Sequence, residues 1–127
     1  MLFRSKASLK EYQEIFKTQK VSPEILDRLV QRIQDWNVKG FRVVCFRPPT
    51  TPEIVSLENE KSGYDEALIK SRVSTAGGVW YDAPQDKYTT YDGNHLTKAG
   101  AMDFSRDIGE FLAVYGNTRV FGHSLTR

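Results

Sequence analysis

Apolar side chains recur at helical spacing in the first third of the chain. Ser22, Pro23 and Glu24 provide an N-cap, a proline in the first turn and an acidic residue near the start of a helix. Asn37 and Gly40 are typical of the end of a helix. The pattern therefore predicts a helix between these signals, with one apolar stripe made of Ile25, Leu26, Leu29, Val30, Ile33 and Trp36.

A shorter and more polar helix is expected before this one. Ser8, with Glu11 three residues later, has the spacing of a capping box, and the polar pattern continues to about Thr18. We therefore expect residues 1–20 to form an N-terminal polar helix, followed by the domain in residues 21–116.

Two short apolar runs predict strands. The first spans residues 41–46 between Gly40 and Pro48, and its near-continuous apolar pattern suits a strand buried on both faces of a parallel sheet. A loop over residues 47–52 follows it. A helix is expected from roughly Tyr64 to Thr75, with Ala67, Leu68 and Val73 at its inner positions. The second strand, residues 79–81, comes after the break at Gly77-Gly78.

The last third combines a turn-rich segment with a long helix. Turn-forming residues are frequent between Asp82 and Asn94, and a helix is predicted from near Thr97. One face of that helix would hold Ala101, Phe104, Ser105, Ile108, Phe111, Leu112 and Tyr115. Residues 117–127 are predicted to be a tail, in which residues 120–123 form an extra strand or a disordered end. The alternating order indicates an α/β fold with a parallel sheet.

Composition indicates one soluble globular domain, or a piece of a larger one. The 127 residues include 18 basic and 16 acidic side chains that are well mixed, so the net charge of +2 gives no reason to expect a nucleic-acid partner. No segment approaches the roughly 18 apolar residues of a membrane span, and no signal peptide is visible, which leaves the cytoplasm as the default compartment. Cys45 lies within an apolar strand and is predicted to be a buried structural thiol.

The segment from Tyr91 to Ala101 carries the chemistry. Asp92 and His95 are three residues apart in a loop that enters a helix, so the carboxylate and the imidazole can hydrogen-bond to each other. Asp92 would then fix the tautomer of His95 and stabilise the imidazolium that forms when His95 removes a proton. Gly93 permits the tight turn between them. We therefore predict that His95 is a general base and Asp92 its orienting residue.

This block resembles the last sequence block of SGNH (GDSL-type) hydrolases, in which Asp-x-x-His-Leu precedes a helix that starts with small residues. The similarity extends upstream, where residues 40–47 look like a late core strand of that fold. The resemblance implies a three-layer, flavodoxin-like α/β architecture, of which the chain holds an incomplete C-terminal part. It also implies hydrolysis of an acyl ester, or acyl transfer, through a serine nucleophile and without a cofactor.

The sequence departs from that family at the nucleophile. The family places its serine in a Gly-Asp-Ser motif after the first strand, and no Gly-Asp-Ser occurs here. None of the serines that are present is predicted at a strand-to-helix elbow. We therefore expect the chain to supply the Asp–His part of a triad and to have little or no hydrolase activity alone.

Other residues are candidates for substrate or metal binding. Tyr91 precedes the Asp–His pair, Asn94 lies between its two members, and both are predicted to contact an acyl substrate. Arg47 follows the first strand and could bind a substrate carboxylate or phosphate. The alternative for Arg47 is a surface ion pair with Glu58 or Glu60. A metal site would have to recruit Asp82, Asp86, Asp92, His95 and His123, whose spacing fits no compact site, so no metal is predicted.

A different class of function is a non-catalytic module. A sheet with only two clear strands would expose an unpaired edge, through which the chain could bind a partner or associate with itself. Asp92 and His95 would then be residues of an ordinary turn near a helix start.

Overall fold

The computed structural model of the chain describes residues 2–122, with side chains for residues 6–115. The elements in chain order are α1 (Leu2–Thr18), α2 (Pro23–Val38), β1 (Val44–Phe46), α3 (Pro52–Lys61), α4 (Glu66–Thr75), β2 (Val79–Tyr81) and α5 (Lys98–Gly122). β1 and β2 pair in parallel, with Cys45 opposite Trp80. The expected mixed α/β class and the parallel sheet are therefore confirmed.

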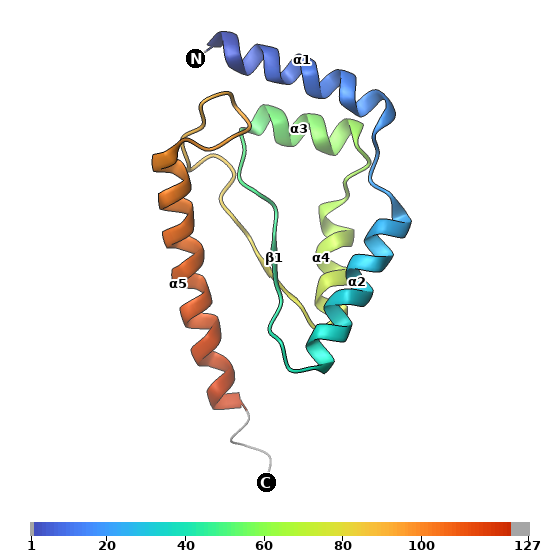
Figure 1. Cartoon of the computed structure of the whole chain (residues 1–127), viewed down its shortest axis with the longest axis vertical. Helices are drawn as coiled ribbons and strands as arrows, with labels where there is room; N and C mark the ends of the chain where they lie inside the picture. The colour runs from blue at the N-terminus through green and yellow to red at the C-terminus, as the bar shows by residue number, and fades with distance from the viewer. Residues whose placement is uncertain (1, 123–127) are drawn as a thin grey trace.

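The core lies between the sheet and the helices α2 and α4 (Figure 1). Its buried members come from α2, α4 and the turn after α4, and they are Ile33, Ile69, Val73 and Ala76. Cys45 of β1 and Trp80 of β2 pack against this cluster from the sheet. Half of the predicted α2 stripe lies outside the core, because Ile25, Leu29 and Trp36 are exposed.

The opposite face of the sheet is covered by α5 through aromatic contacts. Phe104 of α5 meets Phe46 of β1 with ring centroids 5.3 Å apart, and Phe111 meets Tyr81 of β2 at 4.8 Å. Phe104 also makes an edge contact with Tyr88 at 5.4 Å. The predicted inner face of α5 is thus confirmed at its aromatic positions, whereas Ala101, Ser105 and Leu112 are exposed.

The helix α3 was not predicted. Three prolines at positions 48, 49 and 52 favour a loop locally, but Pro52 is the first residue of α3 and Thr51 occupies its N-cap position. Ile54 and Leu57 are three residues apart and bury against the rest of the molecule. α1 packs along α3, and both helices lie at the end of the sheet where β1 ends (Figure 1).

Three further expectations are corrected by the structure. α1 begins at Leu2 rather than near Ser8. In α4 the inner positions are Ile69 and Val73, while Ala67 and Leu68 face solvent. α5 continues to Gly122, so the expected strand or disordered end is helical up to that residue, and His123 lies outside the described residues.

None of the helices between residues 2 and 122 combines the length and the apolarity that a membrane crossing needs.

Candidate active site

Asp92 and His95 lie in a short loop that is closed like a small hairpin before α5. Thr90 and Leu96 form an antiparallel bridge, and the amide of Thr97 donates to the carbonyl of Thr89 at 2.9 Å. Gly93 stands at the tip with φ of 90°, a left-handed conformation that strongly favours glycine. The turn therefore holds Asp92 and His95 on the same side of the loop.

The carboxylate of Asp92 is held at both of its oxygens. Oδ1 accepts hydrogen bonds from the amides of Asn94 at 2.9 Å and His95 at 2.7 Å. Oδ2 lies 2.7 Å from Nδ1 of the His95 ring. Burial raises the pKa of this carboxyl, but the hydrogen bonds from His95 and Asn94 outweigh burial and hold the pKa below its ordinary value. Asp92 is therefore ionised at neutral pH and aimed at His95.

The imidazole of His95 is oriented and open at the same time. Because Nδ1 faces the carboxylate, the neutral ring carries its proton on Nδ1 and its lone pair on Nε2. The ring stacks on Tyr91 with centroids 5.6 Å apart and planes 16° apart. The side chain is still 58% exposed, whereas that of Asp92 is 14% exposed. The geometry thus presents an accessible base that is backed by a half-buried carboxylate.

The loop is anchored to the carboxyl end of β1. The amide of Thr51 donates to the carbonyl of Gly93 at 3.1 Å. Gln85, in the segment between β2 and the loop, binds the segment that follows β1. Its Oε1 accepts from the amide of Thr50 at 3.2 Å, and its Nε2 donates to the carbonyl of Arg47 at 3.3 Å. The carboxyl ends of parallel strands are where open α/β sheets bind ligands, and the Asp–His pair lies at this end of the sheet.

The N-terminal helix reaches the same loop. The side-chain amide of Asn94 donates to the hydroxyl of Tyr12 in α1 at 2.5 Å. Burial raises the pKa of this phenol, with smaller contributions from the nearby carboxylates of Asp92, Glu11 and Glu58. Asn94 therefore links α1 to the Asp–His pair. Sequence reasoning missed Tyr12, Thr51 and Gln85, because their contacts join distant positions and leave no local pattern.

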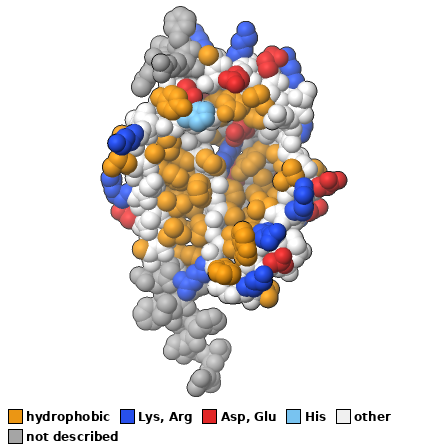
Figure 2. All heavy atoms as spheres, in the orientation of Figure 1, with side chains coloured by type: hydrophobic (Ala, Val, Ile, Leu, Met, Phe, Trp, Pro, Cys, Tyr) orange, Lys and Arg blue, Asp and Glu red, His pale blue; other side chains and the backbone are white. Residues whose placement is uncertain are grey.

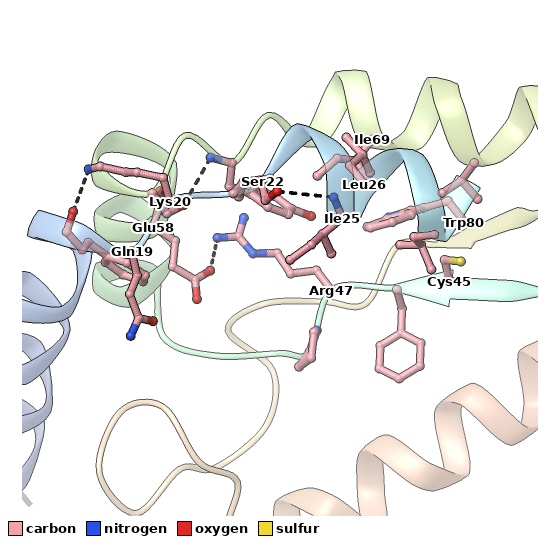
Figure 3. A pocket seen from close by; sticks show the side chains of 18 residues that line it. Gln19, Lys20, Ser22, Ile25, Leu26, Cys45, Arg47, Glu58, Ile69 and Trp80 are labelled. Atoms are coloured by element: carbon pink, nitrogen blue, oxygen red, sulfur yellow. Dashed lines mark hydrogen bonds and ion pairs between the residues drawn. The ribbon is translucent and has the colours of Figure 1, made fainter. Parts of the chain in front are cut away.

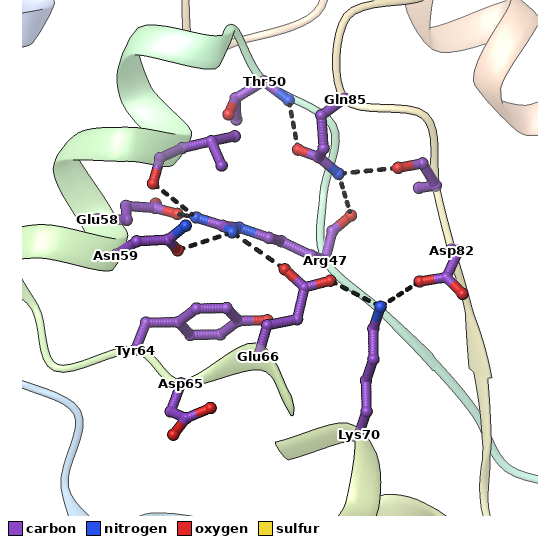
Figure 4. A network of polar contacts seen from close by, with 12 residues as sticks. Arg47, Thr50, Glu58, Asn59, Tyr64, Asp65, Glu66, Lys70, Asp82 and Gln85 are labelled. Carbon is purple, nitrogen blue, oxygen red and sulfur yellow. Dashed lines mark hydrogen bonds and ion pairs between the residues drawn. The ribbon is translucent and has the colours of Figure 1, made fainter. Parts of the chain in front are cut away.

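Arg47 sits in a polar network that joins the end of β1 to α3 and α4, and it is only 7% exposed (Figure 4). Its guanidinium donates to Glu58 at 2.5 Å and to Glu66 at 3.3 Å, and it stacks over the ring of Tyr64 at 4.5 Å. Asn59 and the carbonyl of Val55 accept its remaining hydrogen bonds. The expected ion pair with Glu58 forms, but it is buried rather than on the surface, and Glu60 pairs with Lys61 instead.

The side chains in residues 6–115 do not complete a triad. The ring of His95 has Asp92 as its one hydrogen-bond partner in this region, and no hydroxyl or thiol there binds its other nitrogen. Ser62 is buried and donates to the carbonyl of Glu58. Cys45 is half-buried in the core, where burial raises the pKa of its thiol. The side chains that the structure describes hold no group of three or more His, Cys, Asp or Glu able to bind a metal ion.

Comparisons with known proteins found no matching family model, no similar curated protein and no similar solved structure.

Proposed function

We propose that this chain is the C-terminal part of an SGNH-like serine ester hydrolase or acyltransferase domain and supplies the Asp–His part of its triad. The observation that supports this proposal most directly is the 2.7 Å contact between Nδ1 of His95 and Oδ2 of Asp92, with Nε2 left accessible. The placement of the pair at the carboxyl end of a parallel strand is a second support.

The chemistry follows from the direction of the His95 ring. Nε2 takes the proton of a serine hydroxyl while the serine oxygen attacks the ester carbonyl, and the Asp92 carboxylate stabilises the imidazolium. The imidazolium then gives its proton to the departing alcohol. Water, or an acceptor alcohol, attacks the acyl-serine in the second half of the reaction, with His95 again taking the proton. A general base of this kind contributes about 10² to 10⁴ in rate.

The roles proposed for the neighbouring residues differ. Tyr91 lies flat against His95 and is exposed, so its ring can contact an acyl group held near Nε2. Asn94 is occupied by Tyr12, and its role in substrate binding would be to position that phenol. Arg47 is enclosed by the chain's own carboxylates, and no substrate contact is proposed for it.

A chemical reactivity assay tests the His95 role without needing the serine. Diethyl pyrocarbonate modifies unprotonated imidazole nitrogens, and mass spectrometry separates the chain's two histidines, His95 and His123. We expect Asp92→Asn to slow the modification of His95 at least about threefold, because the ring would lose the carboxylate that holds the proton on Nδ1 and leaves Nε2 as the accessible nucleophile. The rate at His123 should stay the same. Equal rates at His95 in the two proteins would contradict the proposal.

Ester hydrolysis provides the second test. The purified chain should turn over p-nitrophenyl acetate only weakly, because a base without its serine loses nearly all triad catalysis. Whatever turnover exceeds the buffer rate should disappear in His95→Ala and persist in His123→Ala. Turnover that is unaffected by His95→Ala would remove His95 from the mechanism.

A further inference from the structure

The outer edge of β1 has main-chain groups without partners. The amide of Val79 donates to the carbonyl of Val43. Together with the strand register, this hydrogen bond means that the main-chain amide and carbonyl of Cys45 point toward β2. The amides and carbonyls of Val44 and Phe46 therefore point away from β2. No hydrogen bond to any of these four groups is found in the described part of the chain. Such an edge is a template for pairing with another strand.

The layer formed by α2 and α4 is wider than the two-stranded sheet on which it packs. α4 packs on β2, and α2 packs beside α4 on the same face. Two helices side by side cover roughly 20 Å, since each is about 10 Å wide with its side chains. Two strands span only about 10 Å at a spacing near 4.8 Å. α2 consequently extends past β1, over the position that a third strand would occupy.

An apolar groove lies beneath α2 (Figure 3). Its volume is about 670 Å³, and Ile25 and Leu29 of α2, Cys45 and Phe46 of β1, and Trp80 of β2 are among its walls. Figure 2 shows hydrophobic side chains gathered across the middle of the face onto which this edge opens. Ile25 is 61% exposed although it belongs to the apolar stripe of α2. The groove thus lies where every second side chain of an added strand would project.

The charged side chains of the groove already have hydrogen-bond partners within the chain. Arg47 is paired with Glu58 and Glu66, and the ammonium of Lys20 donates to the carbonyls of Phe16 and Lys61. Deeper in the groove the walls are apolar, among them Ile25, Leu29 and Trp80, and a charged side chain placed there would lose its hydration without gaining a partner. The groove therefore suits an uncharged occupant.

We propose that the outer edge of β1 and this groove form a docking site for an extended, uncharged and apolar segment of another polypeptide, which adds to the sheet as a third strand. Its main chain bonds to Val44 and Phe46, and alternate side chains fill the groove beneath α2. A second copy of this chain is a poor occupant, because it would bring its own α2 to the face that α2 already covers. The docking site is distinct from the Asp92–His95 loop, so strand binding and ester hydrolysis can succeed or fail independently.

A model peptide tests the proposal. The probe is a blocked seven-residue peptide in which valine alternates with threonine, and the readout is amide NMR of the full chain. We expect saturable shifts and slower hydrogen exchange at the amides of Val44 and Phe46. The same peptide with proline at its centre lacks one donor and should bind at least about tenfold more weakly.

Two matched variants locate the site. Ile25→Glu places a charge in the groove and should weaken peptide binding at least about tenfold. Val38→Glu puts the same charge on the same helix, at a residue that is 80% exposed and outside the groove, and should bind as the unchanged chain does. Circular dichroism checks that both variants fold.

Three outcomes would overturn the proposal. One is no saturable binding at millimolar peptide. Another is equal binding by Ile25→Glu and Val38→Glu. The third is a dimer in sedimentation whose Val44 and Phe46 amides are protected without any peptide, because the edge would then be occupied by a second copy.

Discussion

At the scale of single residues, Asp92 has more hydrogen bonds than a turn residue needs. An ordinary Asx turn uses one carboxylate oxygen for the amides that follow it, as Oδ1 does with Asn94 and His95. Oδ2 is then free, and here it binds the imidazole. The turn and the hydrogen bond to His95 share one carboxylate, so the structure of the loop and the orientation of the candidate base depend on the same group.

That dependence predicts a pH-sensitive contribution to stability. The pKa of Asp92 is lower in the folded chain than its ordinary value of 3.8, so its ionised form stabilises the fold above that value. This stabilisation is lost as the pH falls below about 4 and through the folded pKa. We expect Asp92→Asn to lower the free energy of unfolding by about 1–2 kcal/mol at pH 7, since hydrogen bonds to a charged acceptor weaken.

Urea unfolding at pH 7 and near pH 3 measures the effect. The difference between the unchanged chain and Asp92→Asn should be smaller at the lower pH. Asp103→Asn, at an exposed position of α5, serves as the control and should change little at either pH. A difference for Asp92→Asn that is the same at both pH values would contradict this explanation.

Arg47 allows a second prediction at this scale. Its buried guanidinium joins residues from the end of β1, from α3 and from the start of α4. Arg47→Met would leave Glu58 without its cation and Glu66 with Lys70 alone, and we expect it to lower the free energy of unfolding by about 2–4 kcal/mol. Arg28→Met, at an exposed position of α2, should cost far less. A loss of under about 1 kcal/mol for Arg47→Met in urea unfolding would show that the network contributes little.

At the scale of elements, the start of α5 is packed tightly against the loop before it. A methyl group at Gly100 would overlap the carbonyl oxygen of Thr89, whereas one at Gly109 would meet no atom within 4 Å. We expect Gly100→Ala to destabilise the chain by about 1–3 kcal/mol through overpacking. Gly109→Ala should stabilise it by about 0.5–1 kcal/mol, because alanine favours the helix.

Thermal unfolding distinguishes these two substitutions, which differ only in position. Opposite shifts in Tm are the expected outcome. Shifts in the same direction would mean that helix propensity dominates and that the contact between Gly100 and Thr89 relaxes at little cost.

The elements differ in how far their own sequence determines them. α2 carries its N-cap, its proline and its apolar stripe within one segment, so it was predicted well. α3 was missed because its prolines resemble a loop, and only the burial of Ile54 and Leu57 against distant residues distinguishes the two. The Asp92–His95 contact was predictable because it spans three residues. The contacts of Tyr12 and Arg47 were not, since their partners are far away in the chain.

At the scale of the whole molecule, the candidate site is assembled from both halves of the chain. Asn94 binds Tyr12 across 82 positions of sequence, and α1 in turn packs on α3 beside the carboxyl end of β1. The N-terminal helix therefore takes part in the site, because α1 contacts its loop directly. The orientation of His95 depends on a loop that is supported from the sheet side by Thr51 and from the helix side by Tyr12.

Removing the Tyr12 hydroxyl should loosen the loop without unfolding the chain. One hydrogen bond contributes about 1 kcal/mol net, which corresponds to about a fivefold increase in local opening. We therefore expect Tyr12→Phe to speed hydrogen exchange of the Asn94 and His95 amides by about that factor. Exchange at Val73 in the core should not change. Glu11→Gln, a neighbouring substitution at an exposed position of α1, should leave all three amides as they are. Equal exchange in Tyr12→Phe and the unchanged chain would show that Thr51 and the Asp92 turn hold the loop by themselves, and that α1 only lies against it.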